Sequence, residues 1–142
     1  MGVQISSQVT TFNVKKSYAA LSGYDTASSF TVTGDVKVRV VGVVGTAITC
    51  TSGTTTLALG TTESTGSIIA ATTIDNSDFG ATDVWVDTSP ANDSERMTED
   101  WVIIGGSADI VLTRNVDDLT AGTLTLYCEW FPLSDDGLVV AA

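Results

Sequence analysis

The sequence lacks histidine altogether, and it contains only two cysteines and two prolines among its 142 residues. Without histidine the chain has neither the usual general base of serine and cysteine hydrolases nor the commonest metal ligand. Two cysteines are too few for a structural zinc site. We therefore predict that the protein is not an enzyme and that it has no catalytic, cofactor-binding or metal-binding residues.

The two cysteines, Cys50 and Cys128, each fall on the apolar face of an expected strand. A free cysteine in such a position usually behaves as a small buried hydrophobic residue. We favour this interpretation over the two alternatives, which are a disulfide and a reactive thiol.

Long hydrophobic runs are also missing, and none approaches the length of a membrane span. The first eight residues have neither the basic start nor the continuous apolar stretch of a secretory signal. We therefore expect synthesis in a cytoplasm and no membrane partner.

Basic residues are scarce, and the net charge of the whole chain is −11. Residues 1–62 carry four basic and two acidic side chains, a net charge of 4 − 2 = +2, whereas residues 63–142 carry two basic and fifteen acidic side chains, 2 − 15 = −13. An acidic protein of this kind repels nucleic acid. We therefore expect no nucleic-acid partner and favour a protein surface as the partner.

Clustered carboxylates raise the question of calcium, which prefers oxygen ligands. Asp75, Asp78 and Asp83 come closest to such a cluster, but their spacing does not match an EF-hand loop. Nearly all the carboxylates lie in expected loops beside glycine, serine and asparagine, so we interpret them as solvated surface groups rather than as metal ligands or a glycosidase acid pair.

Threonine, serine and glycine are abundant, and this mixture favours strands and turns over helices. The clearest strand covers residues 34–44, GDVKVRVVGVV, in which β-branched and charged residues alternate with a period of two. Gly34, the first residue of this stretch, is expected to form a bulge or a bend. Such a strand buries one face and exposes the other, and the buried face is predicted to contain Val36, Val38 and Val40.

The exposed face of this strand carries Lys37 and Arg39. We expect them to pair with acidic neighbours across strands, such as Glu129, in preference to extending a contact surface. The last clear strand covers residues 122–131, and its two faces are predicted to be Leu124, Leu126, Cys128 and Trp130 on one side and Thr125, Tyr127, Glu129 and Phe131 on the other.

The fold class predicted from this pattern is all-β, a single-domain antiparallel β-sandwich or jelly roll of about eight strands with an N-terminal arm. Turn signals predict two hairpins, one joining residues 47–51 to 54–60 and one joining 101–104 to 109–113. We expect an N-terminal arm or first strand over residues 1–24, the sandwich domain over residues 25–133 and a C-terminal tail over residues 134–142.

Four segments resemble small virion proteins of tailed bacteriophages, namely FTVTGDVKVRVVGVVG, ITCTSGTTTLALGTTEST, DNSDFGATDVWVDTSP and DLTAGTLTLYCEWFPLSDDG. The likeness covers roughly residues 8–137, and the proteins concerned look like capsid decoration, or cement, proteins. The resemblance implies a non-enzymatic virion structural protein on the capsid exterior, made in the cytoplasm of a host bacterium. It also implies two partners, the major capsid protein and further copies of this chain in a trimer.

The change of charge along the chain suggests which residues make the contact. We predict that the N-terminal segment reaches the capsid through Lys15, Lys16, Tyr18 and Tyr24. The alternative is a tail, fibre or head-surface module that binds host glycans through exposed tryptophan and the polar loop over residues 89–100. The three tryptophans, Trp85, Trp101 and Trp130, are nevertheless more typical of core or interface anchors than of a sugar platform.

Overall fold

The computed structural model describes residues 11–74, 79–92 and 100–142. Within these residues the chain contains strands and no helix, and therefore no helix that could cross a membrane. The strands are β1 (Phe12–Tyr18), β2 (Ala27–Thr33), β3 (Val36–Val44), β4 (Thr49–Cys50), β5 (Thr56–Gly60), β6 (Ile69–Thr73), β7 (Val84–Trp85), β8 (Val102–Ile104), β9 (Ile110–Asn115), β10 (Leu119–Ala121), β11 (Leu124–Pro132) and β12 (Leu138–Ala141).

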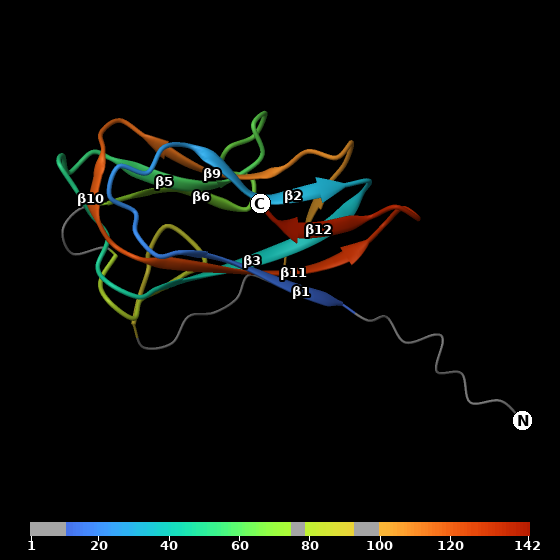
Figure 1. Ribbon diagram of the computed structural model, residues 1–142, viewed down its shortest axis with the longest axis horizontal. Coiled ribbons are helices and arrows are strands. Elements are labelled where there is room, and N and C mark those ends of the chain that lie inside the picture. The colour runs from blue at the N-terminus through green and yellow to red at the C-terminus, as the bar shows by residue number, and fades with distance from the viewer. Residues whose placement is uncertain (1–10, 75–78, 93–99) are drawn as a thin grey trace, which may run out of the picture.

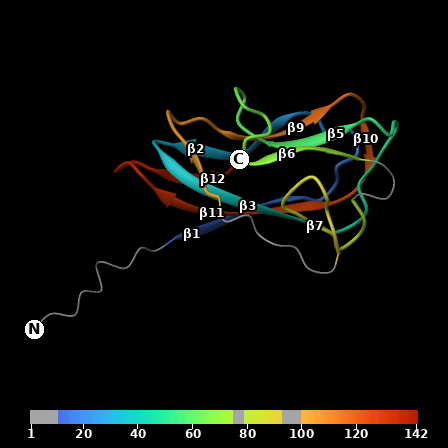
Figure 2. The same ribbon diagram turned by 180° about the vertical axis from the view of Figure 1, so that it is seen from behind.

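Two five-stranded sheets form two layers, as Figures 1 and 2 show. Sheet A has the order β1-β11-β3, with β7 and β8 both pairing with β3. Sheet B has the order β12-β2-β9-β5-β6, and β10 and β4 form a small third sheet. Every strand pair is antiparallel. The predicted all-β class is therefore confirmed, although twelve strands are described where about eight were expected.

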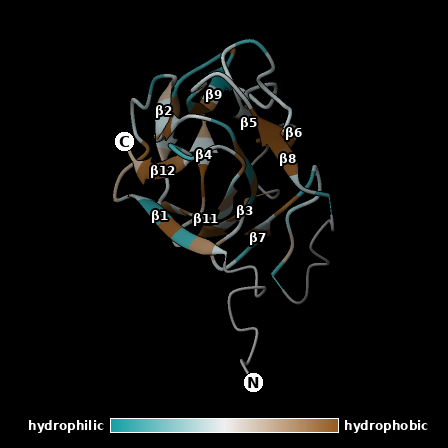
Figure 3. Cartoon of the chain, turned by 90° about the vertical axis from the view of Figure 1, so that its right-hand side faces the viewer, coloured by the Kyte–Doolittle hydropathy of each residue, from teal (hydrophilic) through white to brown (hydrophobic). Residues whose placement is uncertain are grey.

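The alternation predicted for the two longest strands is confirmed. Every second residue of β3 is buried, and so is every second residue of β11 from Leu124 to Trp130. The inward set of each strand carries no charge, whereas the outward sets contain Lys37, Arg39 and Glu129. Only one register therefore keeps all three charges out of the core. Figure 3 shows the same mixture of hydrophilic and hydrophobic positions along β1.

The core joins the two sheets through Trp85 of β7, which is fully buried. Its indole N–H donates a hydrogen bond of 2.9 Å to the hydroxyl of Thr72 on β6, and its ring meets Phe79 edge to face at 5.5 Å between centroids. The expectation of a core anchor is confirmed for Trp85. It is also confirmed for Trp130, which is buried beneath the stacked ring of Phe12.

Two bends carry the chain between the layers at the same end of the molecule. Gly34 links β2 to β3 at a positive φ of 65°, and a side chain there would collide with Ser134 and Asp136. The bend after β11 lies against it, because the Leu133 amide donates to the Asp35 carbonyl at 2.8 Å. Gly34 is thus required both for its conformation and for its lack of a side chain.

Of the two chain-end expectations, the C-terminal one needs correction, and one alternative of the N-terminal one applies. The expected arm over residues 1–24 contains β1, which pairs with β11 over all seven of its residues, so the first-strand alternative applies to residues 12–18. The expected tail over residues 134–142 contains β12, which pairs with β2 as an edge strand of sheet B. Each of these terminal strands is joined to its sheet by a partner that is distant in sequence.

Both predicted hairpins are wrong. Strand β4 pairs with β10 instead of β5, and residues 51–55 lead the chain on to sheet B. Strand β8 pairs with β3 in sheet A, whereas β9 lies in sheet B between β2 and β5. The turn at Gly105 and Gly106 therefore moves the chain from one layer to the other, a connection that turn residues alone do not distinguish from a hairpin.

A strained turn generates the first prediction. Val116, between β9 and β10, has φ = 84° and is exposed, although β-branched residues strongly avoid positive φ. Replacing it by asparagine, which tolerates this conformation, should raise the free energy of unfolding by about 1 kcal/mol. Denaturant unfolding measures the change.

The matched control is Val140→Asn, because Val140 is also exposed but lies within strand β12. Asparagine is a poor strand residue, so this variant should be destabilised. Loss of stability in Val116→Asn equal to that of the control would contradict the assignment of strain to Val116.

Candidate interaction surface

No other strand among the described residues packs on the outward side of sheet A, which is a surface built from three rows of cross-strand neighbours. One row is Lys15, Tyr127 and Val41, the next is Asn13, Glu129 and Arg39, and the third is Phe131, Lys37 and Ile103. We call this surface, together with the Trp101 ring that contacts it, the basic–aromatic face. Its members alternate along the strands with buried residues, so they point away from the core.

The described strands and the remainder of the chain carry opposite charge. The described strands hold five basic residues, Lys15, Lys16, Lys37, Arg39 and Arg114, and a single acidic one, Glu129. The chain has 17 acidic residues, so the other sixteen lie outside these strands. The basic–aromatic face, with three cations and one carboxylate, is consequently a positive surface on an acidic protein.

Arg39 and Glu129 form the central ion pair of this face. The register places them directly opposite each other, and Arg39 Nε donates to Glu129 Oε2 at 2.8 Å. The Thr11 hydroxyl donates to the other oxygen, Oε1, at 3.0 Å. These interactions, the Arg39 hydrogen bond foremost, lower the pKa of Glu129. The predicted cross-strand pairing is confirmed for Arg39.

Lys37 behaves differently from the expectation, because its neighbours are aromatic rings. Its ammonium lies 4.9 Å from the centroid of the Trp101 ring and 5.2 Å from that of Phe131. The guanidinium carbon of Arg39 lies 4.6 Å from the same Trp101 ring. Trp101 therefore holds two cations of β3 through cation–π contacts, and among the described residues Lys37 makes no ion pair.

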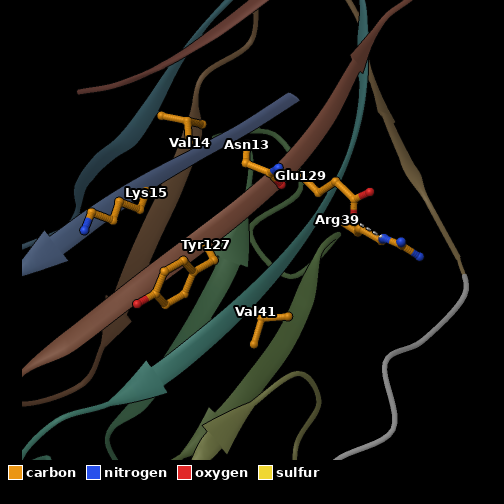
Figure 4. Close-up of a pocket in the computed structure, with 7 residues that line it drawn as sticks. All are labelled: Asn13, Val14, Lys15, Arg39, Val41, Tyr127 and Glu129. Atoms are coloured by element: carbon orange, nitrogen blue, oxygen red, sulfur yellow. Dashed lines mark hydrogen bonds and ion pairs between the residues drawn. The ribbon is translucent and has the colours of Figure 1, made fainter. Parts of the chain in front are cut away.

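A pocket of about 360 Å³ opens on this face, and Figure 4 shows its lining. Lys15 and Arg39 lie at opposite ends of the group, with Tyr127 of β11 between their strands and Val41 on the same strand as Arg39. The lining residues are Asn13, Val14, Lys15, Arg39, Val41, Tyr127 and Glu129. The pocket thus has a basic group at each end, apolar surface from Tyr127 and Val41, and the Glu129 carboxylate paired with Arg39. This lining suits a ligand that carries negative charge on an apolar frame.

The four predicted contact residues do not form one site. Lys15 lies on the basic–aromatic face, but Lys16 lies on the opposite side of β1, near the Tyr18 ring and the Ala142 carbonyl oxygen that it contacts. Alternate residues of a strand point to opposite faces, so Lys15 and Lys16 cannot share one.

The two tyrosines, Tyr18 and Tyr24, make hydrogen bonds within the protein. The Tyr18 hydroxyl lies 2.6 Å from that of Ser29 on β2, and Tyr24 donates its hydroxyl to the Leu112 carbonyl at 2.8 Å. Burial is the main cause that raises the pKa of both phenols. Their rings meet edge to face at 5.4 Å between centroids, so this pair ties β1 to sheet B.

The remaining candidates for chemistry lie elsewhere. The described residues contain no group of three metal-ligating side chains. Asp83 is buried and accepts a hydrogen bond of 2.8 Å from the Gly80 amide, whereas Asp75 and Asp78 lie outside the described residues. Most of the loop at residues 89–100 lies outside them as well.

Neither cysteine is in a disulfide. Cys128 is buried, which raises the pKa of its thiol to about 12. The half-buried Cys50 Sγ lies 2.8 Å from the Ser52 carbonyl oxygen and 3.0 Å from that of Ile74, either of which can accept its one S–H. The interpretation as a small buried residue is confirmed for Cys128.

No family model, curated protein or solved structure matches this chain. The basic–aromatic face must therefore be interpreted from its own chemistry. The period of β11 placed Tyr127 and Phe131 on the exposed side with Glu129, but nothing in the sequence joined Trp101 to Lys37 and Arg39, because that contact depends on the pairing of β8 with β3.

The ion pair predicts a pH dependence. Because the folded-state pKa of Glu129 is lowered from its ordinary value of 4.5, its stabilising contribution is present above that value and is lost as the pH falls through the lower folded value. Between pH 7 and pH 3 the wild type should therefore lose about 0.5 kcal/mol more stability than Glu129→Gln. Urea unfolding at several pH values measures this difference, with the loop variant Glu63→Gln as the control, which should follow the wild type.

The buried thiol predicts selective protection. In a Cys50→Ser variant the sole thiol is Cys128, whose raised pKa and burial should prevent alkylation by iodoacetamide at pH 8. Labelling should occur only as the protein unfolds, at a rate that mass spectrometry follows. Rapid labelling of the folded variant would contradict the buried position of this side chain.

Proposed function

We propose that this chain is a non-enzymatic virion structural protein of a tailed bacteriophage, which binds the outer surface of the head and reinforces the capsid. Its partners would be the major capsid protein and further copies of itself in a trimer. The observation that carries the proposal is the basic–aromatic face, a positive, partly aromatic surface on a protein whose net charge is −11.

The chemistry of this face supports binding to a protein. Aromatic side chains and arginine are enriched at protein interfaces, and Trp101, Phe131 and Arg39 lie together here. Ile103 is 72% exposed beside them, an unusual exposure for so large an apolar side chain. Repeated contacts on a capsid would make even a modest contact of this kind effective through multivalency.

The finer fold assignment belongs to the same proposal. We infer a β-sandwich of the jelly-roll kind, because sheets A and B lie in two layers and the chain changes layer at each of the two adjacent bends, from β2 to β3 and from β11 to β12. The contact site in this proposal is the outward side of sheet A, so of the residues predicted from sequence only Lys15 stays in it.

The test is performed on heads that lack this chain. Recombinant protein should bind them saturably, in proportion to the major capsid protein, and should raise the temperature at which they rupture. Lys37→Glu should weaken binding roughly tenfold, by reversing one charge of the face and removing two cation–π contacts. Sedimentation with the heads measures both effects.

The matched control changes the net charge equally on the other layer. Thr31 and Thr33 are exposed on β2 of sheet B, and Thr31→Glu with Thr33→Glu adds two negative charges, as Lys37→Glu does. This control should bind heads normally. A few copies per virion, or binding of host glycans in place of heads, would contradict the proposal and favour a tail or recognition module.

Truncation is a poorer test. Removing residues up to 20 would delete β1 and leave the edge of β11 unpaired over seven residues. Failure to bind would then follow from a damaged sheet.

A further inference from the structure

We propose that Arg39 is a receptor for a carboxylate, and that the basic–aromatic face binds an acidic, extended segment of a partner protein. This inference rests on the proposed function for the identity of the partner, but its chemistry is tested without it.

The first argument is that Arg39 is held in place on two sides. Glu129 accepts from Nε, and the Trp101 ring lies against the guanidinium. The side chain is nevertheless 30% exposed. Within the described residues the one hydrogen bond of Arg39 is donated by Nε to Glu129. The terminal N–H groups of the guanidinium are the ones that arginine uses to bind a carboxylate through two parallel hydrogen bonds.

Fixing an arginine in this way reduces the entropy that it loses on binding. Glu129 is itself held by the Thr11 hydroxyl, so the support extends to the start of β1. Glu129 therefore acts as a positioning residue, and Arg39 is the group that would contact the partner.

The second argument is the balance of charge. Lys15, Lys37 and Arg39 face one carboxylate, Glu129, which leaves the face at 3 − 1 = +2. This excess matches a segment with a few carboxylates. A long polyanion such as DNA would meet the same face, but it would also be repelled by the overall charge of −11.

The third argument is the apolar surface between the charges. Tyr127 and Val41 share a cross-strand row with Lys15, and Phe131 and Ile103 share one with Lys37. The row that contains Arg39 lies between these two, so apolar groups lie on both sides of it. A segment that alternates acidic and apolar residues would place carboxylates at the cations and side chains on the apolar strip. A sulfated glycan would supply the charge without the apolar groups.

The experiment is an NMR titration of the full chain with a synthetic peptide, Glu-Val-Glu-Val-Glu-Val. Shifts should concentrate at the side chains of Arg39 and Lys15 and at the amides of β1, β3 and β11, and binding should weaken as salt is raised. The same peptide with glutamine in place of glutamate should bind at least tenfold more weakly. Equal binding of the two peptides, or no binding at millimolar concentration, would overturn the inference.

Variants separate a carboxylate receptor from a simple positive charge. Arg39→Lys keeps the charge but loses the bidentate hydrogen bonding of the guanidinium, and it should weaken peptide binding about tenfold. The matched control is Arg114→Lys, because Arg114 also forms ion pairs but lies on β9 of sheet B. Both variants are first checked by thermal unfolding. Unchanged binding by Arg39→Lys would refute the role of Arg39.

Three further outcomes have distinct meanings. Heparin or DNA binding more tightly than the glutamate peptide would refute an acidic protein segment as the ligand. Peptide binding that depends on Arg39, together with no binding to heads, would support the inference and contradict the proposed function. Head binding that is normal in Arg39→Lys would uphold the proposed function and overturn the inference.

Discussion

The pairing of β3 with β11 is the constraint on which the rest of this structure depends. The two strands are joined along nine residues, and each alternates apolar and polar side chains. A shift of β3 by one residue would turn Lys37 and Arg39 into the core, and a shift of β11 would do the same to Glu129, and unpaired charges there are very costly. The register that buries the valines and leucines is therefore the register that brings Arg39 opposite Glu129. Core packing and surface chemistry are specified by the same alternation.

The distribution of charge follows from this architecture. Sixteen of the 17 acidic residues lie outside the described strands, whereas β1 and β3 of sheet A carry four of the six basic residues. The basic–aromatic face is therefore opposite in sign to the net charge of −11, and it attracts an acidic partner. A net charge summed over the chain obscures this division, because it averages two surfaces of opposite sign.

Sequence reasoning succeeded where a strand carries a long, regular period. The period predicted β3, the closing strand β11, their buried faces and the Arg39–Glu129 pair. Sequence reasoning failed for β4, β8 and β12, which have two to four residues and too short a pattern to show a partner. The Trp101 contacts could not be predicted, since they exist only because β8 joins β3. Tyr18 and Tyr24 looked like contact residues because local sequence does not show that their hydroxyls bond within the fold.

An ion pair at the centre of a binding face does not cancel its charge. Glu129 occupies one N–H group of Arg39, and the pair is about 30% exposed, so water weakens its attraction. Meanwhile the geometry that it imposes is retained, because Trp101 and Thr11 also restrain the two side chains. The carboxylate thus costs the face one unit of charge but orients its arginine. A partner carboxylate that meets the remaining N–H groups would exclude water from the pair and strengthen both interactions at once.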